Sequence, residues 1–226
     1  MSHTLHRIGK PADLAGDWIV LAMSARGINR RGSAARLKRF LRMSLKHGPV
    51  NFGDMRTGSS FSGDHRGLLR KISEDSLLNV VFDAETKVRA FLTELREADL
   101  GLSIVLSGLL ARGCRCVREA GLSPNAFAYS LGIWGRRKKL PENHILEITT
   151  MCGHGLVSFA SARRMEQEVA EGRMTAAEAS ARLARVCVCG AFNPVRAARL
   201  LARPRASHEG GGSSRKRSTR AAGARS

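Results

Sequence analysis

Apolar runs alternate with segments of helical period through the first two thirds of the chain. The runs at residues 18–24, 77–82 and 102–108 predict buried strands, residues 125–134 predict a fourth, and 49–53 predict a short one. This rhythm is typical of α/β domains. We therefore expect an α/β fold, with a layered sheet of about four to five strands and flanking helices.

The helices between these strands are marked by end signals. Residues 33–47 form a predicted helix with Ser33 as its cap, and residues 84–101 form another with Asp83 as its cap. A third follows at 109–122. In the helix at 84–101 the apolar residues recur at spacings of three and four, so this helix has one face suited to packing on a sheet: Val88, Phe91, Leu92 and Leu95.

From residue 140 onward the pattern is helical throughout. Helices are predicted at residues 141–152, 157–171, 176–186 and 194–201. Thr175 and Glu178 form a capping box, and Asn193 precedes Pro194 at the start of the last helix. We expect an α/β domain at residues 1–139, a helical C-terminal lobe at 140–202 and a disordered basic tail at 203–226.

The net charge narrows the choice of partners only in part. Lys and Arg outnumber Asp and Glu by 38 to 19, giving +19 over 226 residues. Such a field attracts nucleic acid, anionic membranes and phosphorylated small molecules alike, although a bias toward arginine and alanine also explains it. The chain has no apolar run of about 18 residues and no secretory signal, so we expect a cytoplasmic protein that does not enter a membrane.

Cysteines supply the candidate chemistry. "MCGHG" and "CVCG" each place two ligand types within three residues, and a predicted helical hairpin separates them. Such a hairpin brings its ends together, so we expect Cys152, His154, Cys187 and Cys189 to bind a metal ion. Zn²⁺ is the first choice and an iron–sulfur cluster the alternative. One intervening residue in each pair is fewer than zinc sites usually have.

Other interpretations of the cysteines stay open at this point. Cys187 and Cys189 suit apolar packing at a helix end. Cys152 and His154 are also candidates for a nucleophile and its partner, although the end of a helix raises a thiol pKa. The sequence does not decide whether the protein is an enzyme.

The remaining cysteines and one histidine have simpler interpretations. We expect Cys114 and Cys116 to be structural, because on a helix their side chains point about 200° apart. We expect His144 to be a surface residue.

Basic loops suggest a second site, for an anionic small molecule. Arg26, Asn29, Arg30 and Arg31 follow the first predicted strand, Ser107 ends the third and Arg136 follows the fourth. In a parallel sheet these loops would share one edge, where phosphates and carboxylates bind. The sequence therefore predicts a basic cleft if the strands are parallel.

Nucleic-acid binding is the alternative function. The tail carries "SSRKRSTR", which suits salt-sensitive, non-specific phosphate contacts. Aromatic residues do not interleave with the basic clusters, which disfavours a dedicated reader of bases. The leading hypothesis is a metal-binding protein with a basic cleft for an anionic ligand.

Overall fold

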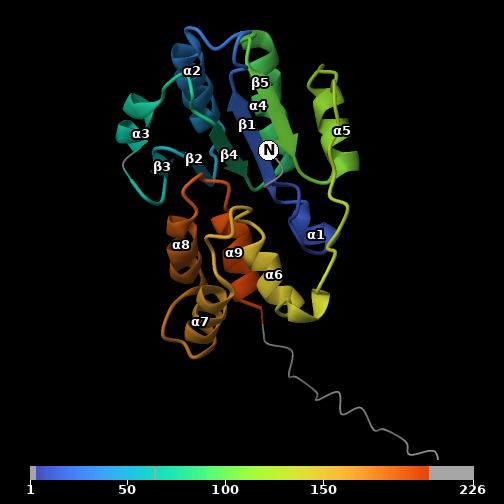
Figure 1. Cartoon of the computed structure of the whole chain (residues 1–226), viewed down its shortest axis with the longest axis vertical. Helices are drawn as coiled ribbons and strands as arrows, with labels where there is room; N and C mark the ends of the chain where they lie inside the picture. The colour runs from blue at the N-terminus through green and yellow to red at the C-terminus, as the bar shows by residue number, and fades with distance from the viewer. Residues whose placement is uncertain (1–3, 64, 204–226) are drawn as a thin grey trace, which may run out of the picture.

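A computed structural model describes residues 4–63 and 65–203 (Figure 1). The strands are β1 (Trp18–Met23), β2 (Asn51–Asp54), β3 (Gly58–Ser59), β4 (Leu78–Phe82) and β5 (Ser103–Ser107). The helices of the first part are α1 (Pro11–Leu14), α2 (Ser33–Lys46), α3 (His65–Lys71), α4 (Glu85–Ala98) and α5 (Leu110–Glu119). A 3-10 turn, η2 (Arg137–Lys139), precedes α6 (Asn143–Thr149), α7 (Phe159–Ala170), α8 (Ala176–Val186) and α9 (Pro194–Leu201).

The five strands form one antiparallel sheet in the order β3-β2-β4-β1-β5. The β1–α2–β2 and β4–α4–β5 connections each join two strands of the same direction with one strand between them. This is the split βαβ, or ferredoxin-like, arrangement. The predicted α/β class with flanking helices is confirmed. The strands are antiparallel, so the condition on which the single basic cleft depended is not met.

Helices α2 and α4 cover one face of the sheet. Trp18, Val20 and Ala22 alternate along β1 and all point into the core that these helices complete. The ring of Phe91 lies 5.3 Å from that of Phe40 on α2 and 5.5 Å from that of Phe82 on β4. The apolar residues of the predicted strands and helices therefore pack against one another in this core.

The opposite face of the sheet contacts the C-terminal lobe, which Figure 1 shows as α6 to α9 grouped at one end of the molecule. Asn79 lies between two core residues of β4, so its side chain points to this other face. It donates to the carbonyl of Cys189 at 3.2 Å, and Asn51 on β2 donates to that of Phe192 at 2.8 Å. Two buried amides thus join the sheet to the lobe.

Several local predictions hold in the lobe. Thr175 and Glu178 form the capping box of α8, and the Asn193 side chain accepts from the Arg196 backbone at the start of α9. A second core of buried residues fills the lobe and includes Cys152, Cys187 and Cys189. The predicted disordered tail, beyond Arg203, lies outside the described residues.

Three local predictions are wrong. Residues 125–134 are not a strand but an exposed irregular segment. Gly32, in a left-handed conformation, takes the cap position of α2 that we assigned to Ser33. Ala84 caps α4 in place of Asp83, whose carboxylate accepts from Lys87 at 2.8 Å. Helix α2 therefore begins one residue earlier than expected, and helix α4 begins one residue later.

Candidate functional site

Two corners of the C-terminal lobe carry the candidate cysteines. The first, residues 150–158, joins α6 to α7 and contains Cys152. The second, residues 187–193, joins α8 to α9 and contains Cys187 and Cys189. Helices α7 and α8 pack against each other between the corners, as the hairpin prediction required. The hairpin therefore returns the chain to where it began.

The three sulfurs meet in the interior. Cys152, Cys187 and Cys189 are all buried, and none of them is in a disulfide. The Cys187 Sγ lies 3.8 Å from the Cys189 Sγ, and the Cys187 thiol also hydrogen-bonds to Cys152. Sulfurs distant in sequence thus form a chain of contacts with Cys187 at its centre.

His154, the fourth predicted ligand, lies on the exposed part of the first corner. Its backbone N–H donates to the Cys152 sulfur. Within the part of the chain that the structure describes, no group of three or more His, Cys, Asp or Glu side chains is arranged to hold a metal ion. The structure therefore links the three sulfurs by contacts through Cys187, but neither these sulfurs nor the imidazole surround an ion position.

Hydrogen bonds shift the pKa values of Cys152 and Cys187 in opposite directions. Donation from the Cys187 thiol outweighs burial and lowers the pKa of Cys152 to about 6. The backbone N–H groups of Leu156 and Val157 add to this effect. The pKa of Cys187 is raised, because its proton is held between Cys152 and Cys189 and because the group is buried. The Cys187 thiol first, and the loop amides second, thus set the state of Cys152.

The second corner is fixed to the sheet by backbone contact. Gly190 has φ +71°, and a Cβ there would lie 2.3 Å from the carbonyl carbon of Phe52 and 2.4 Å from the nitrogen of Gly53. Only glycine permits this approach and this conformation together. The position of Cys189 is therefore determined by β2.

A buried charge network that the sequence analysis did not predict joins both corners to the N-terminal segment. Arg7 reaches Asp17 at 2.6 Å and donates to the carbonyls of Met151 and Ala191, one in each corner. Arg196 on α9 reaches Asp17 at 3.0 Å, as does the Asn193 amide. Asp17 directly precedes an apolar strand, which was the one available hint.

Burial by itself raises the pKa of Asp17, but the charges of Arg7 and Arg196 and the hydrogen bonds from Arg7 and Asn193 outweigh it, so the pKa is below its usual value. Asp17 is therefore a buried carboxylate balanced by two guanidinium groups.

The other cysteines and His144 lie apart from this network. Cys116 belongs to the core of the sheet domain, where burial raises its pKa to about 11, and Cys114 is half-buried on the same helix. The imidazole of His144 lies 3.3 Å from the Glu166 carboxylate and is about half exposed.

The basic loop after β1 borders a surface depression of about 480 Å³. Arg26, Arg30 and Arg31 line it, but so does Glu74, whose carboxylate accepts from the Gly32 N–H at 2.5 Å. The helix start that was expected to receive an anion thus already holds a carboxylate of the chain itself.

Two further residues of this loop make contacts within the protein. Asn29 accepts from Ala25 N at 2.6 Å and donates to Gly101 O at 2.8 Å, so it closes the loop. The guanidinium of Arg30 pairs with Asp75 at 2.6 Å.

Ser107 and Arg136 do not join the loop after β1. Ser107 pairs with Ile19 at the start of β1, whereas that loop leaves the other end of the strand. Its hydroxyl lies 2.8 Å from that of Thr4. Arg136 is on the exposed segment before α6. Because β1 and β5 are antiparallel, their carboxyl ends lie at opposite ends of the strand pair. The loops that follow them therefore do not form a single cleft.

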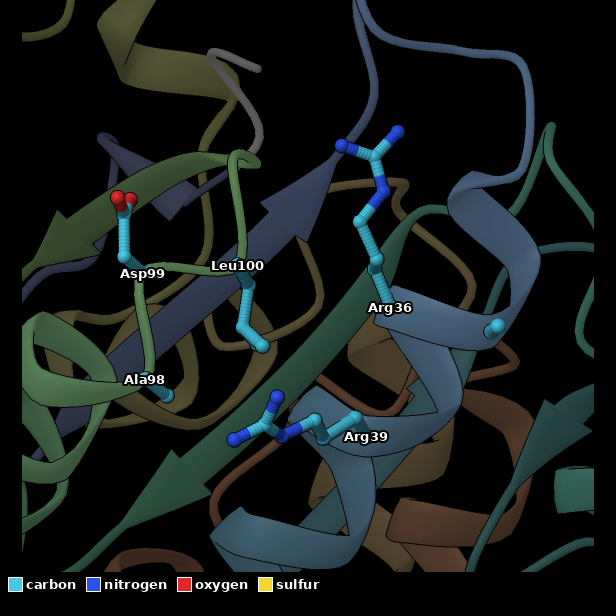
Figure 2. Close-up of a pocket in the computed structure, with 6 residues that line it drawn as sticks. Arg36, Arg39, Ala98, Asp99 and Leu100 are labelled. Carbon is cyan, nitrogen blue, oxygen red and sulfur yellow. The ribbon is translucent and has the colours of Figure 1, made fainter.

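A second depression, of about 310 Å³, lies between α2 and the end of α4. Figure 2 shows Arg36 and Arg39 projecting from α2, with the Asp99 carboxylate pointing away from Arg39. Arg36 is engaged with the carbonyls of Asn29 and Gly101. These contacts are structural.

No protein family, curated protein or solved structure matches this chain. In the described residues, no helix is long and apolar enough to cross a membrane. Function must therefore be argued from the residues of the site.

Proposed function

We propose that the protein binds one zinc ion through Cys152, Cys187, Cys189 and His154, as a structural centre that joins the two corners. The observation that carries the proposal is the approach of three buried thiol sulfurs, none of them in a disulfide, from two distant corners. Three thiolates and one imidazole are a common closed zinc set. The exposed corner allows His154 to turn toward the sulfurs when the ion binds.

The sulfur spacing favours a single ion. Two thiolates at about 2.3 Å from one tetrahedral zinc ion lie about 3.8 Å apart. The Cys187 and Cys189 sulfurs are 3.8 Å apart. Cysteines of a cubane iron–sulfur cluster bind different irons, so their sulfurs stand farther apart. A cubane cluster would therefore need the second corner to open.

Burial favours a structural role over a catalytic one. The Cys152 sulfur lies in the core of the lobe, where a substrate has no path to it. Five cysteines without a disulfide also suit a reducing compartment, which supports the cytoplasmic assignment as part of this proposal. The proposal does not include an anionic ligand, because Glu74 and Asp75 already engage the basic loop.

Metal analysis of protein purified without oxygen tests the proposal. We expect one zinc per chain, and a Co²⁺-substituted protein with visible absorption typical of tetrahedral thiolate ligation. Cys187→Ser should lower zinc affinity more than about 100-fold, because even partners of ligands contribute 10- to 100-fold. Cys114→Ser, on another helix, is the matched control and should change nothing.

A second pair of variants tests the histidine. His154→Ala should weaken zinc binding and change the Co²⁺ spectrum, whereas His144→Ala should not. Failure of the parent protein to bind stoichiometric zinc, or equal affinities in Cys187→Ser and Cys114→Ser, would refute the proposal. Detection of bound iron together with inorganic sulfide would instead show that the site holds an iron–sulfur cluster.

A further inference from the structure

The most exposed apolar part of the described chain is the segment between α5 and α6, residues 123–139. It leaves α5 and passes α1 on its way to α6 (Figure 1). Phe127, Tyr129, Leu131 and Trp134 are 59%, 66%, 75% and 81% exposed. Large apolar side chains gathered in this way commonly mark a binding surface.

The exposed Trp134 ring is held in place. Its Nε1 donates to the Leu131 carbonyl at 2.8 Å. Gly132 and Gly135, with φ of +88° and +84°, turn the backbone on either side of it. The ring is therefore displayed by a specific local structure, which reduces the entropy lost when a planar group stacks on it.

Positive charge follows the aromatic residues directly. Arg136, Arg137, Lys138 and Lys139 are consecutive and exposed, and none forms an ion pair with another described residue. The segment 123–139 contains no Asp or Glu. Arginines elsewhere are often neutralised, as Arg112 and Arg115 are by Glu85. The charge of this segment thus remains available to an anionic partner.

We infer that residues 127–139 bind single-stranded nucleic acid, with Phe127, Tyr129 and Trp134 stacking on bases and the basic run contacting phosphates. Aromatic rings beside a cationic track are the combination that binds single strands without sequence preference. The sequence-based objection was that aromatic residues do not interleave with the basic clusters. Phe127, Tyr129 and Trp134 do, however, directly precede one of these clusters. The structure exposes them immediately before the cations. This site is independent of the zinc centre.

A second copy of the chain is the competing occupant. The alternation of Phe127, Tyr129, Leu131 and Ile133 suits a strand, and β5 lies at an edge of the described sheet. A strand pairing with β5 of another copy would not require four unpaired cations. The charge therefore favours nucleic acid, and self-association becomes an outcome of the test.

Tryptophan fluorescence of the full chain provides the test, since the protein has two tryptophans and Trp18 is fully buried. Titration with oligo(U) and with oligo(dT) should quench the tryptophan emission of the parent protein. Comparison of the affinities for the two oligonucleotides shows whether RNA or DNA is preferred. Trp134→Phe should abolish the quenching. Tyr129→Ala should lower affinity about 5- to 150-fold, the range for loss of one stacked base. Phe159→Ala, an exposed aromatic on α7, is its control.

The basic run is tested by salt dependence. Replacing Arg136, Arg137, Lys138 and Lys139 with Gln should reduce the slope of log affinity against log salt by about 3, at about 0.7 per phosphate contact. A control with Gln at Arg39, Arg42, Arg182 and Arg185 removes the same charge from exposed helical positions. The basic tail is present in both proteins.

Either of two results would overturn the inference. One is an equal loss of affinity in the two charge variants, which would assign binding to the general field of the protein. The other is Trp134 emission that shifts with protein concentration and not with oligonucleotide, which would assign the segment to contact between copies. Circular dichroism should show that all variants are folded, because every altered side chain is exposed.

Discussion

Gly190 is the residue at which the second cysteine corner touches the sheet. Gly190→Ala would place a Cβ 2.3 Å from backbone atoms of β2, which cannot move aside as a flexible side chain can. We expect it to lower the free energy of unfolding by at least about 2 kcal/mol, from clash and left-handed strain together. Urea denaturation measures the loss.

Gly172 supplies the matched control for this prediction. Its φ is +70°, close to that of Gly190, but a Cβ there meets nothing within 4 Å. Gly172→Ala should therefore cost only the backbone term, about 1 kcal/mol. Equal losses in the two variants would mean that the contact with β2 is unimportant.

Sequence reasoning found the residues of the candidate site that local spacing reveals, and missed those that long-range contacts create. Cys152, Cys187 and Cys189 were identifiable because a hairpin between two short motifs predicts their approach. Arg7 and Asp17 were not, because their partners lie more than a hundred residues away in the lobe. A buried ion pair leaves no periodic pattern, so only the fold shows it.

At the scale of elements, the α7–α8 hairpin determines whether the corners meet. Thr175 caps α8 by accepting from the Glu178 N–H, while the Glu178 carboxylate accepts from Thr175 N at 2.9 Å. Thr175→Ala should lower the free energy of unfolding by about 1 kcal/mol, the usual cost of losing an N-cap. Thermal or urea denaturation measures it.

Thr93→Ala is the comparison for the cap. Thr93 is half-buried within α4, and its hydroxyl donates to the Arg89 carbonyl of the same helix. Alanine is the better helix former, so the change should stay within about 0.5 kcal/mol of the parent. A loss at Thr93 as large as that at Thr175 would contradict the capping argument.

The elements also show why one predicted strand failed. The apolar runs at β1, β4 and β5 gave strands because each found a neighbour in the sheet. Residues 125–134 also have a pattern suited to a strand, but in the described sheet β5 pairs only with β1. Periodicity shows that a segment is competent to form a strand, whereas pairing depends on the topology.

At the scale of the whole molecule, the direction of the strands decides which loops share an edge. The apolar runs and helices were predictable, but each predicted βα unit is compatible with both parallel neighbours and a split arrangement. In the split arrangement the loop after β1 and the end of β5 lie at opposite edges, so their polar residues cannot share a ligand. The lobe instead meets the sheet through Asn79, Asn51 and Gly190.

The buried charge network gives the assembled molecule a dependence on acid. The pKa of Asp17 is lower in the folded protein than its usual value, so the carboxylate stabilises the fold above its unfolded pKa of about 3.9. That stability is lost as the pH falls through the lower folded value, because protonation leaves Arg7 and Arg196 buried without a counter-charge. We expect the metal-free protein, held in chelator, to lose stability below about pH 4.

Asp17→Asn separates this network from general acid effects. At neutral pH the substitution should lower the free energy of unfolding by about 3–5 kcal/mol, as does breaking a buried ion pair. As the pH falls, the free energy of unfolding of the variant should decrease less steeply than that of the parent protein. Asp75→Asn, at a half-exposed pair with Arg30, should cost at most about 1 kcal/mol and keep the parent's slope.

Because Arg7 also holds Met151 and Ala191, Asp17→Asn should weaken zinc binding as well. If Asp17→Asn and the parent unfold with the same pH dependence in urea, Asp17 does not link the sheet, the N-terminal segment and the two corners in the way the contacts imply.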